Sequence, residues 1–354
     1  MSSFLQKNFI SRRHPFWQQV PEEKWTSWTW QLQNKITSIE QLEILQRFDP
    51  SFDLDLDDIK KTQTQFHFGI TPYYFSLMNL ADPTCPIRLQ GIPSSRENAK
   101  RLNEFQDFPK EESMMPVPGL THRYPDRAML YTTHHCAVYC RFCTRKRKVS
   151  DPSSALQSKQ IFDAIAYLKT KPEIREVILS GGDIFSFSDK QLDEILTAVR
   201  SIEHIEIVRL GTRNLVTLPF RVTESLLKVF MKHSPLYIHT HFNHPRECSL
   251  EAYLACRKLR EAGCVVNNHT VLLKQVNDRT EILKELSRKL IPMGVQPYYL
   301  YHCDLTYGSN HFRTRIQDDV DLIRELQGQT QWDSSIEVPH YMIDTPGGGK
   351  IELN

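Results

Sequence analysis

A regular alternation of two kinds of segment fills the chain from about residue 127 and constrains the fold more than any other feature. Six short apolar runs rich in β-forming residues are each followed by a longer, charged and amphipathic run. Such alternation predicts a parallel sheet with right-handed helical crossovers. The expected strands are residues 128–133, 176–179, 205–210, 236–241, 265–271 and 297–301, and a last extended run is 337–343. The expected helices are residues 155–169, 189–201, 223–232, 250–261, 279–290 and 316–327.

Six βα units are compatible with two α/β architectures, a doubly wound sheet and an incomplete (β/α)6 barrel of the TIM type. In both, reactive groups gather at the carboxyl ends of the strands. Residues 1–115 lack the alternation, and their recurring tryptophans predict a mainly helical accessory region with an aromatic packing face. Residues 116–335 would form the α/β domain, and residues 336–354 a strand and a glycine-rich arm.

The composition indicates a globular protein of a reducing compartment. With 354 residues, 40% of them hydrophobic, the chain can bury a large core. A net charge of +2 argues against a dedicated nucleic-acid binder, which carries a strong basic excess. Residues 1–15 have no apolar core, and no run of about eighteen apolar residues occurs, so we expect neither a signal peptide nor a membrane-spanning helix. We therefore expect a cytoplasmic protein with reduced thiols.

Three cysteines with the spacing C-x3-C-x2-C, Cys136, Cys140 and Cys143, lie just after the first predicted strand. A basic run, residues 144–148, follows at once, and its positive field is expected to lower the thiol pKa values. Three thiolates without a local fourth suit an iron–sulfur cluster with one open iron, whereas structural zinc requires four protein ligands. The spacing alone is a weak signal, because buried cysteines often serve only packing.

The basic run from Arg145 to Lys148 allows more than one interpretation. It forms a solvated face, or Arg145 enters the site and pairs with a substrate carboxylate, for which a planar guanidinium is suited. The sequence does not decide between a solvated face and an arginine that binds the substrate carboxylate. A protein of another class, a metal-stabilised nucleic-acid binder, would also use this run, but it leaves the C-terminal glycines unexplained.

Polar side chains follow the other predicted strands as well, and together they indicate one shared site. The second strand ends in Ser180, Gly181, Gly182 and Asp183, where paired glycines allow a close backbone approach to a ligand. Further polar strand ends are residues 211–213, 239–244, 267–269 and 301–304. His239, His241 and His244 suggest zinc, but no carboxylate at a familiar spacing completes the set, so we expect hydrogen-bonding histidines.

Three glycines, Gly347 to Gly349, precede Lys350 near the C-terminus. The signature of a phosphate loop is not met, because no Ser or Thr follows the lysine and no βα unit follows the loop. A lysine on a glycine-rich arm instead suits a Schiff base with pyridoxal phosphate. A disordered tail is the plain alternative, and the extended run at 337–343 argues against it.

The cysteine spacing, with an aromatic residue before the third cysteine, resembles the radical S-adenosylmethionine enzymes. The closer resemblance is to the lysine 2,3-aminomutase family and extends from about Thr71 to Lys350. The supporting segments are residues 71–74, 82–88, 122–127, 180–183, 241–245, 271–278, 297–301 and 303–305. The chain ends at Asn354 without the cysteine-bearing extension of the longer aminomutases, and in this it is similar to the bacterial enzymes that make β-lysine for elongation factor P.

The resemblance implies an incomplete (β/α) barrel with N-terminal helices and three cofactors, a 4Fe–4S cluster, S-adenosyl-L-methionine and pyridoxal 5'-phosphate. It assigns the cluster to Cys136, Cys140 and Cys143, the amino end of S-adenosylmethionine to Ser180, Gly181, Gly182 and Asp183, and pyridoxal phosphate to Lys350. Positions around the cofactors are further implied for Arg123, Tyr124, Arg127, His241 and Tyr301. Arg145 would hold the substrate carboxylate, and Asp304 and Asp344 the distant ammonium of lysine, because a buried charge must be paired.

The implied reaction moves the amino group of lysine from Cα to Cβ and gives β-lysine; the alternative is an aminomutase for another amino acid, such as arginine. The implied partners are the amino acid and an external electron donor such as flavodoxin or ferredoxin, without membrane or nucleic acid, and a homo-oligomer is compatible with the sequence. The chain departs from the family pattern at two points. Three glycines stand where the family has four, which brings Asp344 one residue closer to Lys350, and His269 replaces a usual glutamine.

Overall fold

The protein is built on a nine-stranded sheet whose strand order follows the chain from β1 to β9. The computed structural model describes residues 9–99, 104–108, 110–149, 151–154, 156–327, 337–345 and 349–353. Strands β2 to β8 are parallel, and β1 and β9 are added antiparallel at the two edges. The strands are β1 Leu120–Tyr124, β2 Arg127–Thr133, β3 Glu176–Gly181, β4 Ile207–Gly211, β5 Tyr237–Thr240, β6 Val265–Leu272, β7 Gln296–His302, β8 His340–Asp344 and β9 Lys350–Glu352.

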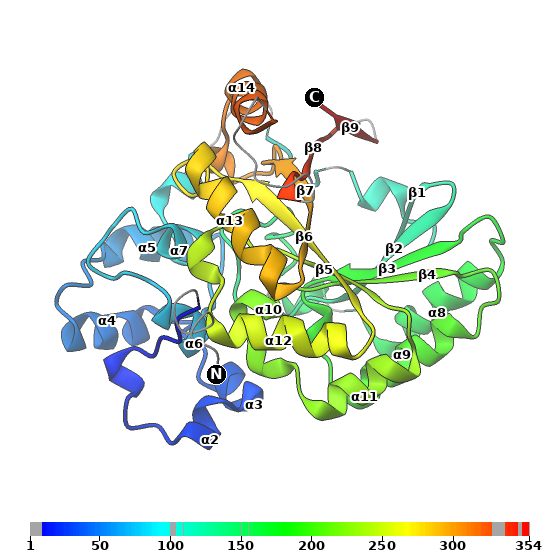
Figure 1. The fold of residues 1–354 in the computed structure, drawn as a ribbon, viewed down its shortest axis with the longest axis horizontal. Coiled ribbons are helices and arrows are strands. Elements are labelled where there is room, and N and C mark those ends of the chain that lie inside the picture. Colours follow the sequence, from blue (N-terminus) through cyan, green and yellow to red (C-terminus); the bar gives the residue numbers. More distant parts are fainter. Residues whose placement is uncertain are drawn as a thin grey trace.

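Helices connect the parallel strands and cover the outer side of the curved sheet (Figure 1). They are α8 Ser158–Lys169, α9 Asp189–Arg200, α10 Asn214–Thr217, α11 Glu224–Lys232, α12 Leu250–Glu261, α13 Thr280–Met293 and α14 Ile316–Gln327. Local chemistry fixes their ends. Ser188 and Gln191 form a capping box at the start of α9. Gly294 takes φ +72° directly after α13, a left-handed conformation that favours glycine and lets the chain turn into β7.

The six predicted βα units are confirmed, with ends that match or shift by at most three residues. In the described part of the chain the first and last strands do not pair, so the sheet remains open, as in an incomplete barrel. The predicted run at 337–343 corresponds to β8. Two strands were not predicted, β1 and the three-residue β9, which pairs with β8 between Ile351 and Ile343. Gly347 and Gly348 of the predicted arm lie outside the described residues.

The accessory region is helical, as predicted, and packs against the β4–α11 connection through α3 and α6. Its helices are α2 Glu22–Trp25, α3 Trp28–Gln33, α4 Ile39–Phe48, α5 Leu56–Gln63, α6 Pro72–Ser76 and α7 Pro86–Gly91. Trp17 and Trp25 are buried within the same apolar core that continues into Leu210 of β4. This continuity means that the accessory helices and the barrel stabilise each other; the boundary at residue 115 stays a prediction.

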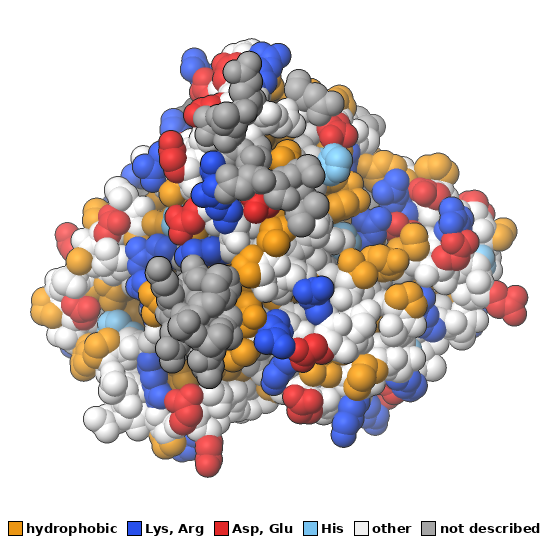
Figure 2. All heavy atoms as spheres, in the orientation of Figure 1, with side chains coloured by type: hydrophobic (Ala, Val, Ile, Leu, Met, Phe, Trp, Pro, Cys, Tyr) orange, Lys and Arg blue, Asp and Glu red, His pale blue; other side chains and the backbone are white. Residues whose placement is uncertain are grey.

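The surface mixes both signs of charge. Figure 2 shows acidic and basic side chains interspersed over the visible face, in keeping with the net charge of +2. Among the helices of the ranges given above, none combines the length and the apolar character that a membrane crossing requires.

Candidate active site

A cavity of about 360 Å³ lies at the carboxyl ends of the parallel strands. The structure brings most of the predicted site residues together in its walls. They are Cys136, Cys140, Cys143, Arg145, Ser180, Gly181, Gly182, Asp183, His241, Tyr301, Asp304, Asp344 and Lys350. Arg123, Tyr124 and Arg127 are not part of this lining and belong to β1 and β2. The polar strand ends therefore share one site, as the βα pattern predicts.

The paired glycines after β3 bring this strand end against the cysteine loop. The Gly182 amide donates to the Thr133 carbonyl at 2.5 Å, and the Asp183 amide donates to the His135 carbonyl at 2.8 Å. A Cβ on Gly182 would lie 2.5 Å from the His135 carbonyl oxygen, which is too close for any side chain. The predicted close backbone approach is thus made to the neighbouring loop, and glycine is required there.

Asp183 is fully engaged with its own protein neighbours. Its carboxylate accepts from the Thr212 hydroxyl at 2.6 Å and from the amides of Arg213 and Phe185 at 2.7 and 3.0 Å. Burial raises its pKa to about 6. Asp183 therefore joins the ends of β3 and β4. Because the Gly182 amide is also engaged, the Ser180 side chain and the glycine carbonyls are the groups of this segment left to meet a ligand.

The three cysteines are free thiols on the cavity wall, and neighbouring regions fix their loop. Lys35 of the accessory region donates to the Cys136 carbonyl at 3.2 Å. Arg213 donates to the Cys140 sulfur at 2.8 Å and to Glu247 at 2.7 Å. The role of Arg213 was not predicted, although it stands at a polar strand end.

The expectation that the basic run lowers the thiol pKa values was wrong. Burial, followed by the neighbouring carboxylate and thiols, raises the pKa of Cys136 well above its usual value, and burial also raises that of Cys143. The reason is that burial of the sulfurs outweighs the charges of the run, although Arg145 and Lys146 still act to lower the pKa of Cys143. Each base of the run is in addition paired with an acid between residues 97 and 112. The pairs are Arg145–Glu111, Lys146–Glu97, Arg147–Asp107 and Lys148–Glu112.

Arg145 therefore does not belong to a solvated face, and its guanidinium is not free of protein partners. It reaches the cavity wall, but its Nε donates to Glu111 at 3.0 Å and its Nη2 contacts the other oxygen of the same carboxylate. The nucleic-acid interpretation loses its support for the same reason, because the bases that it requires are already neutralised.

A histidine pair forms a neutral hydrogen bond on one side of the cavity. His239 Nδ1 lies 2.6 Å from His269 Nε2. Burial lowers the pKa of His239 to about 3 and that of His269 well below its usual value, so one neutral ring donates to the other. His241 lines the same cavity, whereas His244 accepts from the Arg246 amide and caps a short helix. His239 and His244 thus make hydrogen bonds, as predicted, whereas His241 Nδ1 is buried without a partner.

Lys350 brings its amine to the wall of the cavity beside the histidine pair, since the Tyr301 ring that it approaches lies 5.6 Å from the His269 ring. The amine contacts the Tyr301 hydroxyl and lies 4.5 Å from the centre of the Tyr301 ring. Withdrawal from water lowers the pKa of Lys350, and Asp344 opposes this shift. Arg123 binds the carbonyls of Thr345 and Gly349 at 3.1 and 3.3 Å, so that β1 holds the segment that carries the lysine.

Asp304 and Asp344 are two carboxyls at this wall with few protein partners. Burial, and next the charge of Asp344, raises the pKa of Asp304 to about 8. No described residue donates to the Asp304 carboxyl; the Ser309 hydroxyl bonds its backbone carbonyl instead. Asp344 lies 3.5 Å from Arg123 Nη1 without a hydrogen bond, and burial raises its pKa too. Such a pair suits a cationic group.

The residues present fit the three cofactors that the sequence implies. Three thiols face one cavity from one loop, which is the ligand set of an iron–sulfur cluster with one open iron. Beside the lysine segment, Arg123 Nε and the Tyr124 hydroxyl are buried donors without an acceptor. Unsatisfied buried donors are costly, and an anionic group such as a phosphate would satisfy both.

The chain is similar to known proteins over nearly its whole length. The Radical SAM superfamily matches residues 130–286. An L-lysine 2,3-aminomutase of Fusobacterium nucleatum is 41% identical over 97% of this chain and 79% of its own length. An L-lysine 2,3-aminomutase of Clostridium subterminale is 40% identical over 96% of this chain and 80% of its own length. A glutamate 2,3-aminomutase of Clostridioides difficile is 37% identical over 94% of this chain and 77% of its own length.

Proposed function

Because the chain belongs to the lysine 2,3-aminomutase family of radical S-adenosylmethionine enzymes, we propose that it converts lysine to β-lysine by moving the amino group from Cα to Cβ. The observation that carries the choice of substrate is the pair of half-buried carboxyls, Asp304 and Asp344. The side chain of lysine ends in an ammonium, which would neutralise them. The side chain of glutamate would bring a further negative charge to a wall that already holds two acidic groups, which is unfavourable away from water.

The cofactors of this family are a 4Fe–4S cluster, S-adenosylmethionine and pyridoxal phosphate. When bound, they supply a carbon radical that removes hydrogen and a conjugated ring that carries the migrating nitrogen. Cys136, Cys140 and Cys143 would hold the cluster and leave one iron open. Ser180 and the backbone of Gly181 and Gly182 would then bind the amino end of S-adenosylmethionine.

Lys350 would hold pyridoxal phosphate, and its lowered pKa supports this role because only a neutral amine attacks a carbonyl. Tyr301 contacts the amine and would orient it. Arg123, Tyr124 and Arg127 would bind the phosphate from β1 and β2, where Arg123 Nε and the Tyr124 hydroxyl have no other acceptor. His241 would complete the cofactor surroundings from β5.

Arg145 would bind the substrate carboxylate with the N–H groups that Glu111 does not occupy. Glu111 would fix the plane of the guanidinium, which makes a two-point contact geometrically selective. The substrate would thus be held at both ends, its carboxylate by Arg145 and its ammonium by Asp304 and Asp344. Holding both ends fixes the position of the migrating group between them.

The cellular setting follows from the same chemistry. The eight cysteines are all free thiols, which suits a reducing compartment such as the cytoplasm. The reaction also requires an external one-electron donor, such as flavodoxin or ferredoxin. The names of the relatives specify lysine or glutamate and lend no support to the arginine alternative.

The test is anaerobic turnover by the reconstituted enzyme. We expect β-lysine from lysine, S-adenosylmethionine and dithionite, and much slower turnover of glutamate and arginine. Lys350→Ala should lose both the yellow band of bound pyridoxal phosphate and the activity, while it keeps the brown absorbance of the cluster. An enzyme with full iron content that makes no β-lysine, or that prefers glutamate, would refute the proposed function.

A further inference from the structure

A basic pocket on the outer surface lies directly behind the cysteine loop. We propose that this pocket is the docking site for a small acidic protein that carries a one-electron reductant. The inference rests on the proposed function, which requires an electron at the cluster. We call the site the Lys274 pocket and define it by Arg96, Lys274, Gln275, His311, Phe312 and Arg313.

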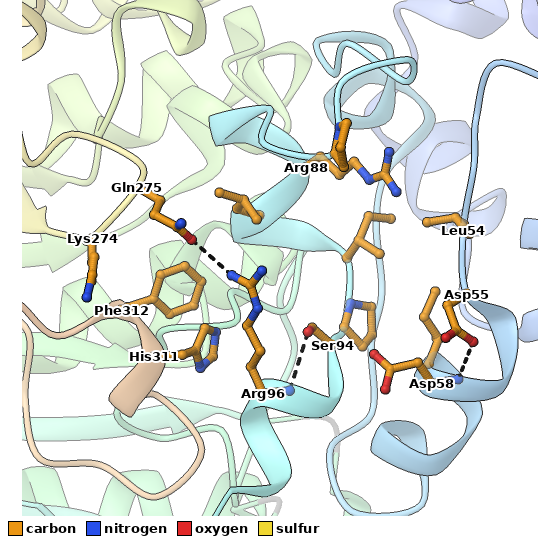
Figure 3. A pocket seen from close by; sticks show the side chains of 15 residues that line it. Leu54, Asp55, Asp58, Arg88, Ser94, Arg96, Lys274, Gln275, His311 and Phe312 are labelled. Carbon is orange, nitrogen blue, oxygen red and sulfur yellow. Dashed lines mark hydrogen bonds between the residues drawn. The ribbon is translucent and has the colours of Figure 1, made fainter.

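The Lys274 pocket consists of two adjoining hollows of about 180 and 400 Å³ that share Arg96, Lys274, Gln275 and His311. Figure 3 shows Arg96 reaching towards Gln275, with Phe312 behind them and Lys274 at the rim. The Lys274 amide donates to the Phe312 carbonyl at 2.8 Å, so rim and floor belong to one connected piece of structure. Arg96 and Lys274 are exposed and accessible to a partner.

The charge of the larger hollow is uniformly basic. Arg96, Lys274 and Arg313 line it together with a neutral His311, whose pKa burial lowers to about 4, and no carboxylate lines it among the residues that the structure describes. Arg96 bonds only the neutral amide of Gln275, at 2.9 Å, and Lys274 has no carboxylate partner in the described ranges. Two exposed cations without carboxylate partners attract an acidic surface and speed its approach.

The carboxylates nearby are already engaged. At the far side of the smaller hollow, Asp55 caps the Asp58 amide at 2.9 Å and Asp58 accepts from the Ser95 amide at 2.8 Å (Figure 3). The pKa of Asp318 of α14 is lowered mainly by its hydrogen bonds to Arg315, at 2.6 and 2.8 Å, and only to a lesser degree by the charge of Lys274. Asp55 and Asp58 line only the smaller hollow and Asp318 lines neither, so the larger hollow keeps its basic lining.

The floor of the pocket leads to the cysteine loop through a single aromatic pair. Phe312 lines the pocket, is only 2% exposed, and meets Phe142 edge-to-face with 6.4 Å between ring centres. Phe142 stands between Cys140 and Cys143 in the sequence, and Cys140 packs against the same apolar cluster. A donor seated in the pocket is thus separated from the cluster position by little more than two rings.

The Lys274 pocket gives an electron an entry that neither the cavity nor the basic run provides. The cavity mouth would be filled by cofactors and substrate in the working enzyme, so an electron requires another entry. The run from Arg145 to Lys148 is paired with acids and offers no free charge. The electron step is simple: the donor, a reduced flavin or iron–sulfur centre, loses one electron, the oxidised cluster gains it, and no bond changes.

The test measures reduction of the cluster in the reconstituted enzyme by an acidic flavodoxin, mixed anaerobically and followed by loss of the cluster's visible absorbance. Lys274→Glu and Arg96→Glu should each slow the second-order rate about tenfold at low ionic strength. The difference should disappear at high salt, because exposed charges are screened. Lys228→Glu, an exposed lysine on α11, is the matched control and should react like the wild type.

Iron content and melting temperature establish that the variants are folded and loaded. Equal rates for both pocket variants and the wild type at low ionic strength would overturn the docking proposal. A repeat with a plant-type ferredoxin should give the same order of rates, and the opposite order would also overturn it. Failure of the proposed function is distinguishable, since it would appear as absence of β-lysine with dithionite, whereas the docking result depends only on cluster reduction.

Discussion

Replacing Asp304 by asparagine should stabilise the cofactor-free protein while it abolishes tight lysine binding. Asparagine has nearly the same shape as aspartate but carries no charge. Asp304 lies half-buried in the cavity wall, and its withdrawal from water together with the charge of Asp344 raises its pKa to about 8. Like charges in an empty binding site destabilise the folded protein until a ligand of opposite charge binds. Removing one of these charges should therefore stabilise the empty protein and weaken ligand binding for the same reason.

The magnitude follows from the difference in proton affinity between the folded and unfolded chain. An unfolded aspartate has a pKa of about 3.9. At pH 7, about three pH units above this value, the carboxyl of the unfolded chain is ionised, and folding must return a proton to it. Each unit corresponds to about 1.36 kcal/mol, so Asp304 raises the free energy of folding by about 4 kcal/mol. An acid with a raised pKa costs nothing below about pH 4 and costs more as the pH rises towards 8. The variant should therefore gain stability mainly at neutral and alkaline pH.

The assay compares melting temperatures of cofactor-free wild type and Asp304→Asn between pH 5 and 8.5. Since about 1 kcal/mol corresponds to roughly 2–4 °C in domains of 150–250 residues, we expect an advantage of several degrees at pH 7 to 8 that shrinks towards pH 5. Asp321→Asn, an acid that is 61% exposed on α14, is the control and should show no such trend. In the loaded enzyme, Asp304→Asn should raise the KM for lysine at least about thirtyfold.

Equal melting temperatures of Asp304→Asn and wild type at pH 8 would refute this reasoning, because they would mean that the carboxyl is not destabilising in the empty site. A variant that melts higher but keeps the wild-type KM would contradict the prediction that Asp304 contributes to lysine binding. In that case the half-buried pair would exist, but the lysine ammonium would bind elsewhere.

Three further predictions concern the same cavity. The KM for lysine should fall as the pH rises towards about 8, because the ammonium must displace the proton of Asp304 before it can pair, and a flat profile between pH 6 and 8 would contradict this. Gly182→Ala should lower the iron and sulfide content after reconstitution, since its Cβ would lie 2.5 Å from the His135 carbonyl, whereas full cluster content would show that the loop tolerates the displacement. Arg213→Lys keeps the charge but loses the fork that donates to Cys140 and Glu247, so the cluster's reduction potential, measured by spectroscopic titration, should fall; an unchanged potential would exclude this hydrogen bond as a determinant.

The βα framework was predictable because its signals are local. Apolar strands and amphipathic helices alternate in the sequence, and a capping box such as Ser188 with Gln191 marks a helix start within four residues. The site was predictable at the same level, since the carboxyl ends of parallel strands must meet at one edge of the sheet. Strand β9 escaped prediction because Lys350–Glu352 is too short and too exposed to leave a periodic signal.

The electrostatic state of the site was not predictable from the sequence. The basic run predicts a positive field, but Glu97, Asp107, Glu111 and Glu112, which cancel it, lie more than thirty residues earlier in the chain. The hydrogen bond between Arg213 and Cys140 joins different βα units in the same way. Such contacts depend on tertiary packing, and a spacing pattern carries no signal for them.

The short helix η2, Ser95–Asn98, shows how the two charge arrangements around the cysteine loop arise together. Glu97 points inward, fully buried, and accepts from Arg141 at 2.6 and 2.9 Å and from Lys146 at 2.8 Å. Although burial alone would raise its pKa, these cations lower the pKa of Glu97 to about 2. The preceding residue, Arg96, faces outward into the Lys274 pocket. Helix η2 therefore supplies the carboxylate that pairs with the buried bases of the cysteine loop, and it also places a basic side chain on the outer surface. An acidic partner is attracted to that surface, behind the cluster.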